Sequence, residues 1–150
     1  MSLIWKVKDF EELTSTQLYA ILELRIAVFM LEQQCLYPEC DYKDVKSLHL
    51  MGLLEGKLVA YARVVPPNVS YKEASIGRVV THQAYRQFGY GKSLMEKAIA
   101  LAAEVFPDDN IRISGQQYLE QFYNNLGFAT VSEVYLEDNI PHLEMLLKRN

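Results

Sequence analysis

Cysteine is scarce in this chain, with Cys35 and Cys40 as the two examples among 150 residues. They lie five positions apart, without a His or Cys pair at zinc-binding spacing, so we expect neither a structural metal nor a disulfide framework. The apolar runs are far shorter than the roughly 20 residues that cross a bilayer. The first eight residues also lack the apolar stretch and cleavage site of a signal peptide. These absences predict a cytoplasmic protein without a membrane partner.

The chain also lacks a strong excess of either charge. Charged residues make up 23 % of the sequence and the formal net charge is −4, which argues against a disordered segment and against a nucleic-acid-binding surface. The mild acidity favours a cationic or amine substrate. Half of the residues are hydrophobic, enough for one core, and no repeat or linker interrupts the sequence. We therefore expect a single domain over residues 1–150.

The order of apolar patterns and turn residues predicts an α+β fold with a mixed central sheet flanked by helices. Gly127 is placed where a left-handed helix cap belongs, and residues 35–46 are expected to form a loop with at most one short helix. The expected strands are 4–7, 48–54, 58–65, 74–81, 111–114, 129–137 and 142–147, the last two joined by a turn at 138–141. The expected helices run from a cap at 14–16 to residue 32 or 33, from the loop at 85–91 to about Val105, and from 117 to 126.

The segment from Val79 to Lys92 is the most informative for function, because an expected strand runs into a loop whose glycines open a helix. Gly89 and Gly91 allow positive φ angles and a close approach of a ligand to the backbone. Successive N–H groups at such a helix N-terminus form a nest for a pyrophosphate, and Arg86 and Lys92 add positive charge beside it.

Three other interpretations apply to this loop. Gly91-Lys92-Ser93 resembles the end of a P-loop, but the glycine required five residues earlier is Arg86, which disfavours a nucleotide-dependent phosphotransferase. A dinucleotide fingerprint needs a third glycine that is missing after Gly91. An ordinary glycine-bearing turn before a helix stays open on the two glycines alone.

Two motifs together resemble the GNAT superfamily of N-acetyltransferases. Arg86-x-x-Gly89-x-Gly91 after an apolar strand is similar to the acyl-CoA signature of that family, and Phe122-Tyr123-Asn124-Asn125-Leu126-Gly127-Phe128 resembles its second motif. Further stretches resemble the ElaA-type branch, a group of bacterial GNAT proteins. They are Arg25-x-x-Val28-Phe29-x-x-Glu32-Gln33-x-Cys35, Tyr61-Ala62-Arg63, Ile76-Gly77-Arg78-Val79 and Glu137-Asp138-Asn139-Ile140-Pro141-His142. Two positions depart from the family pattern. Many GNAT members have a proline at the position of Gln83, and some relatives carry a catalytic glutamate at the start of the strand that begins here with Ile111.

The resemblance implies transfer of an acetyl group from acetyl-CoA to a primary amine of a small molecule or peptide, by direct attack in a ternary complex. It implies that the backbone of Val79, Val80 and Thr81 pairs with the pantetheine arm and offers an N–H to the developing oxyanion. The phosphates would lie on Arg86 and on the loop formed by Gln87, Phe88, Gly89, Tyr90, Gly91 and Lys92. No metal is implied, and a homodimer is compatible with the sequence. A non-catalytic acyl-CoA-binding or regulatory module on the same fold is the alternative.

The catalytic roles are assigned from chemistry together with the second motif. Tyr123 is the expected general acid, because a phenol stays protonated at neutral pH, although its apolar neighbours also allow a core tyrosine. His142, or a water that it holds, is the expected base. Glu32 and Glu137 are expected to bind the acceptor at an acidic mouth, with an ion pair to Arg25 as the structural alternative for Glu32.

Several other charged or titratable residues are interpreted as structural. His49 and His82 are weaker candidates for the base, Asp41 and Asp44 are expected to be solvated loop residues, and Arg63 and Arg78 are expected to form internal salt bridges.

Overall fold

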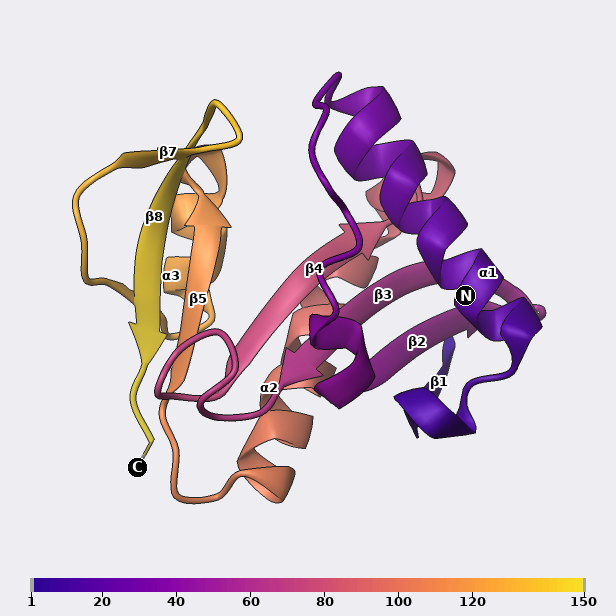
Figure 1. Ribbon diagram of the computed structural model, residues 1–150, viewed down its shortest axis with the longest axis horizontal. Helices are drawn as coiled ribbons and strands as arrows, with labels where there is room; N and C mark the ends of the chain where they lie inside the picture. Colours follow the sequence, from indigo (N-terminus) through magenta and orange to yellow (C-terminus); the bar gives the residue numbers. More distant parts are fainter. Residues whose placement is uncertain (1, 150) are drawn as a thin grey trace.

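Two four-stranded sheets form the frame of the molecule in a computed structural model that describes residues 2–149 (Figure 1). The first sheet has the order β1-β2-β3-β4, and the second has the order β5-β8-β6 with β7 also paired to β8. All ladders inside the two sheets are antiparallel. The strands are Ile4–Asp9 (β1), Leu48–Leu54 (β2), Lys57–Val65 (β3), Ser75–Thr81 (β4), Ile111–Gln116 (β5), Ala129–Thr130 (β6), Tyr135–Glu137 (β7) and Ile140–Leu147 (β8).

Helices cover both faces of the first sheet, which explains why β3 is an almost continuous apolar run. On one face, Ile21, Leu24 and Val28 of the first helix pack against Met51, Tyr61 and Val80. On the other face, α2 (Tyr90–Val105) packs against the sheet. The apolar cluster between α2 and the sheet is separate from the first and continues into β5, β8 and α3 (Glu120–Asn125). The expected α+β class with helices flanking the sheet is therefore confirmed, and a parallel bridge between the two antiparallel parts makes the arrangement mixed.

The first helix differs from the expected continuous α-helix. Thr14 caps it through a reciprocal pair of bonds with Gln17, as its sequence predicts. The α-helix α1 ends at Arg25 (Ser15–Arg25), and the next turns are a π-helix, η2 (Ile26–Glu32). The N–H of Gln33 bonds the carbonyl of Val28, five residues back, at 3.2 Å. Such widened turns are rare and frequently occur at functional sites.

The end of the chain also departs from the expectation. The single strand expected at 129–137 is two short strands, β6 and β7, and the expected turn at 138–141 is shorter. Asp138 and Asn139 both have positive φ, as a two-residue hairpin loop requires. Pro141 lies near the start of β8, a position that proline tolerates. Shorter helical turns occupy Phe10–Glu12 (η1), Lys43–Lys46 (η3), Gln83–Phe88 (η4) and Gln117–Leu119 (η5).

Among residues 2–149, backbone pairing joins the two sheets only where β4 and β5 begin. A parallel bridge joins Ala74 to Ile111, and the N–H of Arg112 donates to the Ala74 carbonyl at 2.9 Å. Beyond that point no backbone pairing between β4 and β5 is present among residues 2–149. Figure 1 shows the two strands diverging from this start, with the end of the first helix on one side and the β7–β8 hairpin on the other. The fold thus places an unpaired edge of β4 opposite β5.

Candidate active site

A cleft of about 520 Å³ opens where β4 and β5 diverge. Its walls come from η2 and the following loop, from β4, from β5 and α3, and from the β7–β8 hairpin. It is lined by Val28, Phe29, Glu32, Gln33, Cys35, Tyr37, Ile76, Gly77, Arg78, Val79, Val80, Thr81, Arg86, Gly91, Ile113, Ser114, Gln116, Tyr118, Leu119, Phe122, Tyr123, Glu137, Asp138, Ile140 and His142. The residues predicted for catalysis, for pantetheine pairing and for acceptor binding therefore line one cavity.

The glycine loop lies beside this cleft, but only Arg86 and Gly91 of residues 86–92 line it. Gly89 has a φ of 75° and separates η4 from α2, so the expected left-handed conformation is present there. Gly91 is helical, and its contribution is the space left by a missing side chain, since an added Cβ would meet only Thr81 Cγ2 at 4.0 Å. The rings of Phe88 and Tyr90 lie against each other at a tilt of 38°, outside the cleft. Gln87 and Lys92 are exposed, also outside it.

Arg86 and Glu32 form an ion pair across the cleft entrance. Both terminal nitrogens of Arg86 donate to the Glu32 carboxylate, at 2.6 and 2.7 Å, and the guanidinium also reaches the Thr81 carbonyl at 3.4 Å. The hydrogen bond from Arg86 lowers the pKa of Glu32. The expected pair between Glu32 and Arg25 is wrong, because Arg25 points into the interior.

Tyr123 lies in α3 with its ring buried and its hydroxyl in the cleft. Within residues 2–149, no group forms a hydrogen bond with this hydroxyl. Burial, with a smaller contribution from Tyr118, raises the pKa of Tyr123 to about 12. The phenol is therefore protonated at neutral pH and has a hydrogen bond to donate.

The position of Tyr123 depends on a residue that our sequence analysis missed. Gly115 in β5 faces the Tyr123 ring, and a Cβ there would lie 2.9 Å from Tyr123 Cε2. A separation that short forces a shift of the ring or the strand. Gly115 lies directly after the strand expected at 111–114, and the observed strand continues to Gln116. A glycine inside a strand often marks a close approach of another group, so a longer expected strand would have given this signal.

His142 and Glu137 form a second pair, on the hairpin side of the cleft. The Nδ1 atom of His142 is 2.6 Å from the Ile140 carbonyl, which assigns its proton to Nδ1 and leaves Nε2 to accept one. Glu137 Oε2 lies 3.4 Å from Nε2, where its charge would stabilise a proton taken up there. Ser114 donates to the same carboxylate at 3.3 Å. This geometry suits a base at Nε2.

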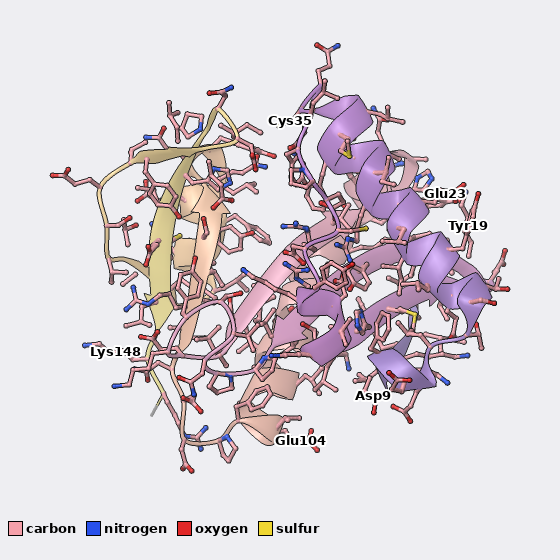
Figure 2. The ribbon with its side chains drawn as sticks, in the orientation of Figure 1. Asp9, Tyr19, Glu23, Cys35, Glu104 and Lys148 are labelled. Carbon is pink, nitrogen blue, oxygen red and sulfur yellow. The ribbon has the colours of Figure 1, made fainter. Side chains whose placement is uncertain are left out.

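Two contacts connect the walls of the cleft on the acceptor side. Cys35 Sγ donates to the Asp138 carbonyl at 3.4 Å, and Gln116 Nε2 donates to Gln33 Oε1 at 3.3 Å. Figure 2 labels Cys35 in the segment that follows η2, at the end of the helix nearest the hairpin. The end of the first helix and the last hairpin, which are far apart in sequence, therefore meet over this part of the cleft.

A network of buried charges lies beneath the cleft and corrects the solvated interpretation of Asp41 and Asp44. Asp44 accepts from Arg25 NH1 at 2.8 Å and from Arg63 NH1 at 3.0 Å. Asp41 receives both terminal nitrogens of Arg63, at 2.8 and 2.7 Å. Arg78 joins the network through its contacts with Glu39 and Asp41. The internal salt bridges expected for Arg63 and Arg78 are present.

The two weaker histidine candidates have structural surroundings. His49 is buried between the Tyr61 hydroxyl at 2.7 Å and the Asp44 carbonyl at 2.9 Å, and burial lowers its pKa. His82 accepts from the N–H of Ala84 at 3.1 Å and caps η4. Neither lines the cleft.

The structure also describes the two cysteines, the grouping of metal-binding side chains and the lengths of the helices. Both cysteines are free thiols, Cys35 buried and Cys40 exposed. Among residues 2–149, no three His, Cys, Asp or Glu side chains are grouped so that they could hold a metal ion. In the same part of the chain, every helix is too short or too polar to cross a membrane.

Comparisons with known proteins agree with this architecture. Residues 18–149 match the family model described as acetyltransferase (GNAT) domain. The chain is 38 % identical to protein ElaA of Escherichia coli strain K12 over 143 residues, 94 % of each chain. It is 43 % identical to a UPF0039 protein of Schizosaccharomyces pombe, again over 94 % of each chain, so such relatives are not confined to bacteria.

Solved structures extend the likeness to three dimensions. A crystal structure of an acyl-CoA N-acyltransferase from Pseudomonas aeruginosa superimposes with a TM-score of 0.93 at 42 % identity, covering 98 % of this chain and 100 % of that one. The crystal structure of Escherichia coli ElaA gives 0.92 at 36 % identity, covering 97 % and 99 %. The chain belongs to the GNAT acetyltransferase family and is similar to its ElaA-type branch over nearly its whole length.

Proposed function

We propose that the protein transfers an acetyl group from acetyl-CoA to a primary amine of a small molecule or peptide, by direct attack in a ternary complex. The observation that carries this proposal is the cleft between β4 and β5, which combines an unpaired strand edge with the unbonded hydroxyl of Tyr123. The family acts on amine acceptors with CoA donors. The choice of acetyl-CoA, the primary amine and a cytoplasmic setting are parts of the proposal.

The donor would be held by backbone groups more than by side chains. The edge of β4 at Val79, Val80 and Thr81 lines the cleft and can pair with the amides of a pantetheine arm as a strand would. The first turn of α2, a helix of 16 residues, offers backbone N–H groups and the positive end of the helix dipole, both suited to a pyrophosphate. Arg86 is close enough to add its charge once Glu32 releases it.

The reaction needs one bond made, one broken and two protons moved. The neutral amine nitrogen attacks the thioester carbonyl carbon and a β4 N–H stabilises the oxyanion. The C–S bond then breaks, the nitrogen releases its second proton to water, and the CoA thiolate takes up a proton from water. A thiol titrates near 8.5, below the raised pKa of Tyr123, about 12. Full proton transfer from Tyr123 to the thiolate is therefore unfavourable at equilibrium, and its hydroxyl contributes mainly by a charge-assisted hydrogen bond to the leaving sulfur.

The amine would enter on the opposite side, where Glu137 and the Asp138 loop give the cleft an acidic edge. An ammonium ion is attracted there but must lose a proton before it can attack. The Nε2 atom of His142, or a water bound to it, would accept that proton with Glu137 opposite.

Replacing Gly91 tests the donor site. Gly91→Val adds a side chain at the cleft wall where the backbone has to meet the phosphates, while an added Cβ meets nothing closer than 4.0 Å in the protein itself. We expect calorimetry to show a loss of acetyl-CoA affinity of about tenfold or more with the fold retained, an effect of the size of a lost charged hydrogen bond. Ala103→Val, at an exposed position of the same helix, is the matched control. Unchanged binding by Gly91→Val would refute the donor site.

Replacing His142 tests the acceptor side. The wild-type rate at saturating acetyl-CoA should rise with pH, because the imidazole has to be neutral to accept the proton of the amine. His142→Ala should remove this rise and lower turnover about 10²- to 10⁴-fold, the usual contribution of a general base. The screen is thiol release with amino acids, polyamines, amino sugars, aminoglycosides and peptide N-termini. An unchanged profile, or preference for an acceptor of net negative charge, would remove His142 and the acidic edge from the mechanism.

A further inference from the structure

We propose that Arg78 and Glu39 are positioning residues for the donor. Glu39 holds Arg78 in a left-handed conformation, this conformation creates a bulge in β4, and the bulge sets where the amides of Val79 and Val80 lie. The inference rests on the proposed function, in which those amides meet the acyl-CoA. Neither residue needs to touch the reacting atoms.

The bulge is visible in the pairing of β3 with β4. Tyr61 faces Val80 and Arg63 faces Gly77, so Ala62 stands opposite two residues, Arg78 and Val79. The extra residue bends the strand and redirects its N–H and C=O groups, an arrangement that is common beside active sites. Residues 77–81 all line the cleft, so any change in the bulge moves its wall.

Arg78 has a backbone conformation that its residue type disfavours. Its φ is 51°, in the left-handed region where a side chain with a Cβ is strained and glycine is not. The preceding residue, Gly77, is not the one with the positive φ. Such strain persists only where surrounding contacts fix the residue, so the contacts of the Arg78 side chain are decisive.

Glu39 supplies those contacts. Arg78 Nε is 3.0 Å from the Glu39 carboxylate, and Arg78 NH2 is 3.1 Å from the Glu39 carbonyl. Asp41 Oδ2 is a second acceptor, 3.5 Å from Arg78 Nη2. The guanidinium also lies over the Tyr37 ring, 5.6 Å from its centroid. The side chain of Arg78 is therefore fixed at both ends of its guanidinium by one loop residue.

Glu39 is itself held from the opposite side. Arg25, at the junction of α1 with η2, donates from Nε to the Glu39 carboxylate and from NH2 to its carbonyl at 3.2 Å. Tyr37 donates its hydroxyl to the same carboxylate. The Glu39 side chain is 3 % exposed, so water competes little for these bonds. Glu39 thus links the first helix to the β4 bulge.

Two substitutions at one position separate the bulge from the side-chain bonds. Arg78→Gly and Arg78→Ala both remove every contact with Glu39, so both should lower the melting temperature by a similar amount. Glycine adopts the left-handed conformation freely, whereas alanine does not. We expect Arg78→Gly to bind acetyl-CoA within about twofold of wild type, and Arg78→Ala to bind about 5- to 30-fold more weakly, the equivalent of the left-handed penalty.

A measurement without ligand distinguishes failure of this inference from failure of the proposed function. The backbone amide resonances of Val79 and Val80 should stay near their wild-type positions in Arg78→Gly and move in Arg78→Ala. If they do so while wild type does not bind acetyl-CoA, the proposed function is wrong and the role of the bulge contacts stands. If both variants keep wild-type resonances and affinity, or if both lose affinity equally, the inference is wrong.

Glu39→Gln provides the complementary test, because it removes the charge while keeping the side-chain shape. It should weaken acetyl-CoA binding as Arg78→Ala does, and adding Arg78→Gly to it should restore affinity. Failure of the glycine to rescue a folded Glu39→Gln protein would contradict the proposal. Should Glu39→Gln not fold because Arg25 loses its partner, the Arg78 pair decides alone.

Discussion

The hydroxyl of Tyr123 shows how much a single side chain depends on neighbours from other elements. The second motif predicted a general acid at Tyr123, whereas its apolar sequence neighbours allowed a core tyrosine. In the structure the ring packs against Phe122 and Phe128 while the residue lines the cleft, so burial of the ring does not exclude a role for the hydroxyl. Gly115 provides the space for that ring.

Tyr123→Phe should keep acetyl-CoA affinity and lower turnover. Removing the hydroxyl leaves the ring contacts in place and deletes the donor to the leaving sulfur, so we expect a decrease in kcat of about 10- to 1000-fold. Steady-state assays of thiol release with the best acceptor measure kcat, and calorimetry measures the affinity for acetyl-CoA. Tyr19→Phe, which removes an exposed hydroxyl from α1 (Figure 2), is the control. An unchanged kcat would show that Tyr123 is a core tyrosine without a role in turnover.

Side-chain partners were the part of the site that the sequence could not predict. The loop was identified from its phosphate-binding chemistry and the second motif from its resemblance to the family. Residues of both lie in or beside the observed cleft. Glu32, however, was matched to Arg25 by helical spacing, and its observed partner, Arg86, is 54 positions away. Asp41 and Asp44 looked solvated for the same reason, because their arginines come from the first helix and from β3. Local patterns carry no information about such distant pairs.

At the scale of elements, turn residues predicted the structure well and strand continuity predicted it poorly. The hairpin from β2 to β3 has the expected extent, and Glu55 and Gly56 supply its two positive φ angles. The strand expected at 129–137 is interrupted because the Ser132 hydroxyl, and not a carbonyl, accepts the N–H of Glu144 at 2.8 Å. An interruption made by a side chain gives no signal in the hydrophobic pattern.

The pair between Glu32 and Arg86 couples two elements, η2 and η4, that we assign to different substrates. If Arg86 binds phosphate, Glu32 competes for it in the free protein, and the carboxylate is released toward the acceptor when CoA binds. Glu32→Gln should then tighten CoA binding about two- to tenfold, in the range of a surface ion pair or slightly above it. It should also raise KM for the amine, with a smaller effect on kcat.

Isothermal calorimetry with CoA and steady-state kinetics with varied amine measure both effects of Glu32→Gln. Glu104→Gln, at an exposed position near the far end of α2 (Figure 2), is the control for the loss of one negative charge. Weaker CoA binding by Glu32→Gln would show that the pair holds Arg86 ready for phosphate instead of competing with it.

At the scale of the whole molecule, the buried charges tie together parts that the apolar core does not. The larger apolar cluster spans both sheets on the side of α2 and α3. On the other side, the loop after the first helix is attached to the first sheet through Arg63 and Arg78, and to the first helix through Arg25. This loop forms one wall of the cleft, so the ion pairs support the site as well as the fold.

The same ion pairs should make the protein labile to acid. Burial opposes ionisation of Asp41, but hydrogen bonds from Arg63 outweigh it and hold the pKa of this carboxyl well below its usual range. Burial likewise opposes ionisation of Asp44, and Arg25 more than offsets it, so its pKa is also lowered. A carboxyl group with a lowered pKa in the folded state stabilises that state at pH values above its unfolded pKa, about 3.9. This stability is lost as pH falls through the folded pKa.

The free energy of unfolding, measured by urea titration, should therefore decrease steadily between about pH 5 and pH 2. Asp41→Asn should cost about 1–3 kcal/mol at pH 7, because Arg63 loses a charged hydrogen-bond partner, and it should flatten the decrease toward acid. Asp108→Asn, at an exposed position after α2, should keep the wild-type slope. If Asp41→Asn shows the same acid slope as wild type, the ion pair between Asp41 and Arg63 does not contribute to stability, and the loop wall of the cleft must be held by the contacts of Arg25 and Arg78 and by the pair between Arg63 and Asp44.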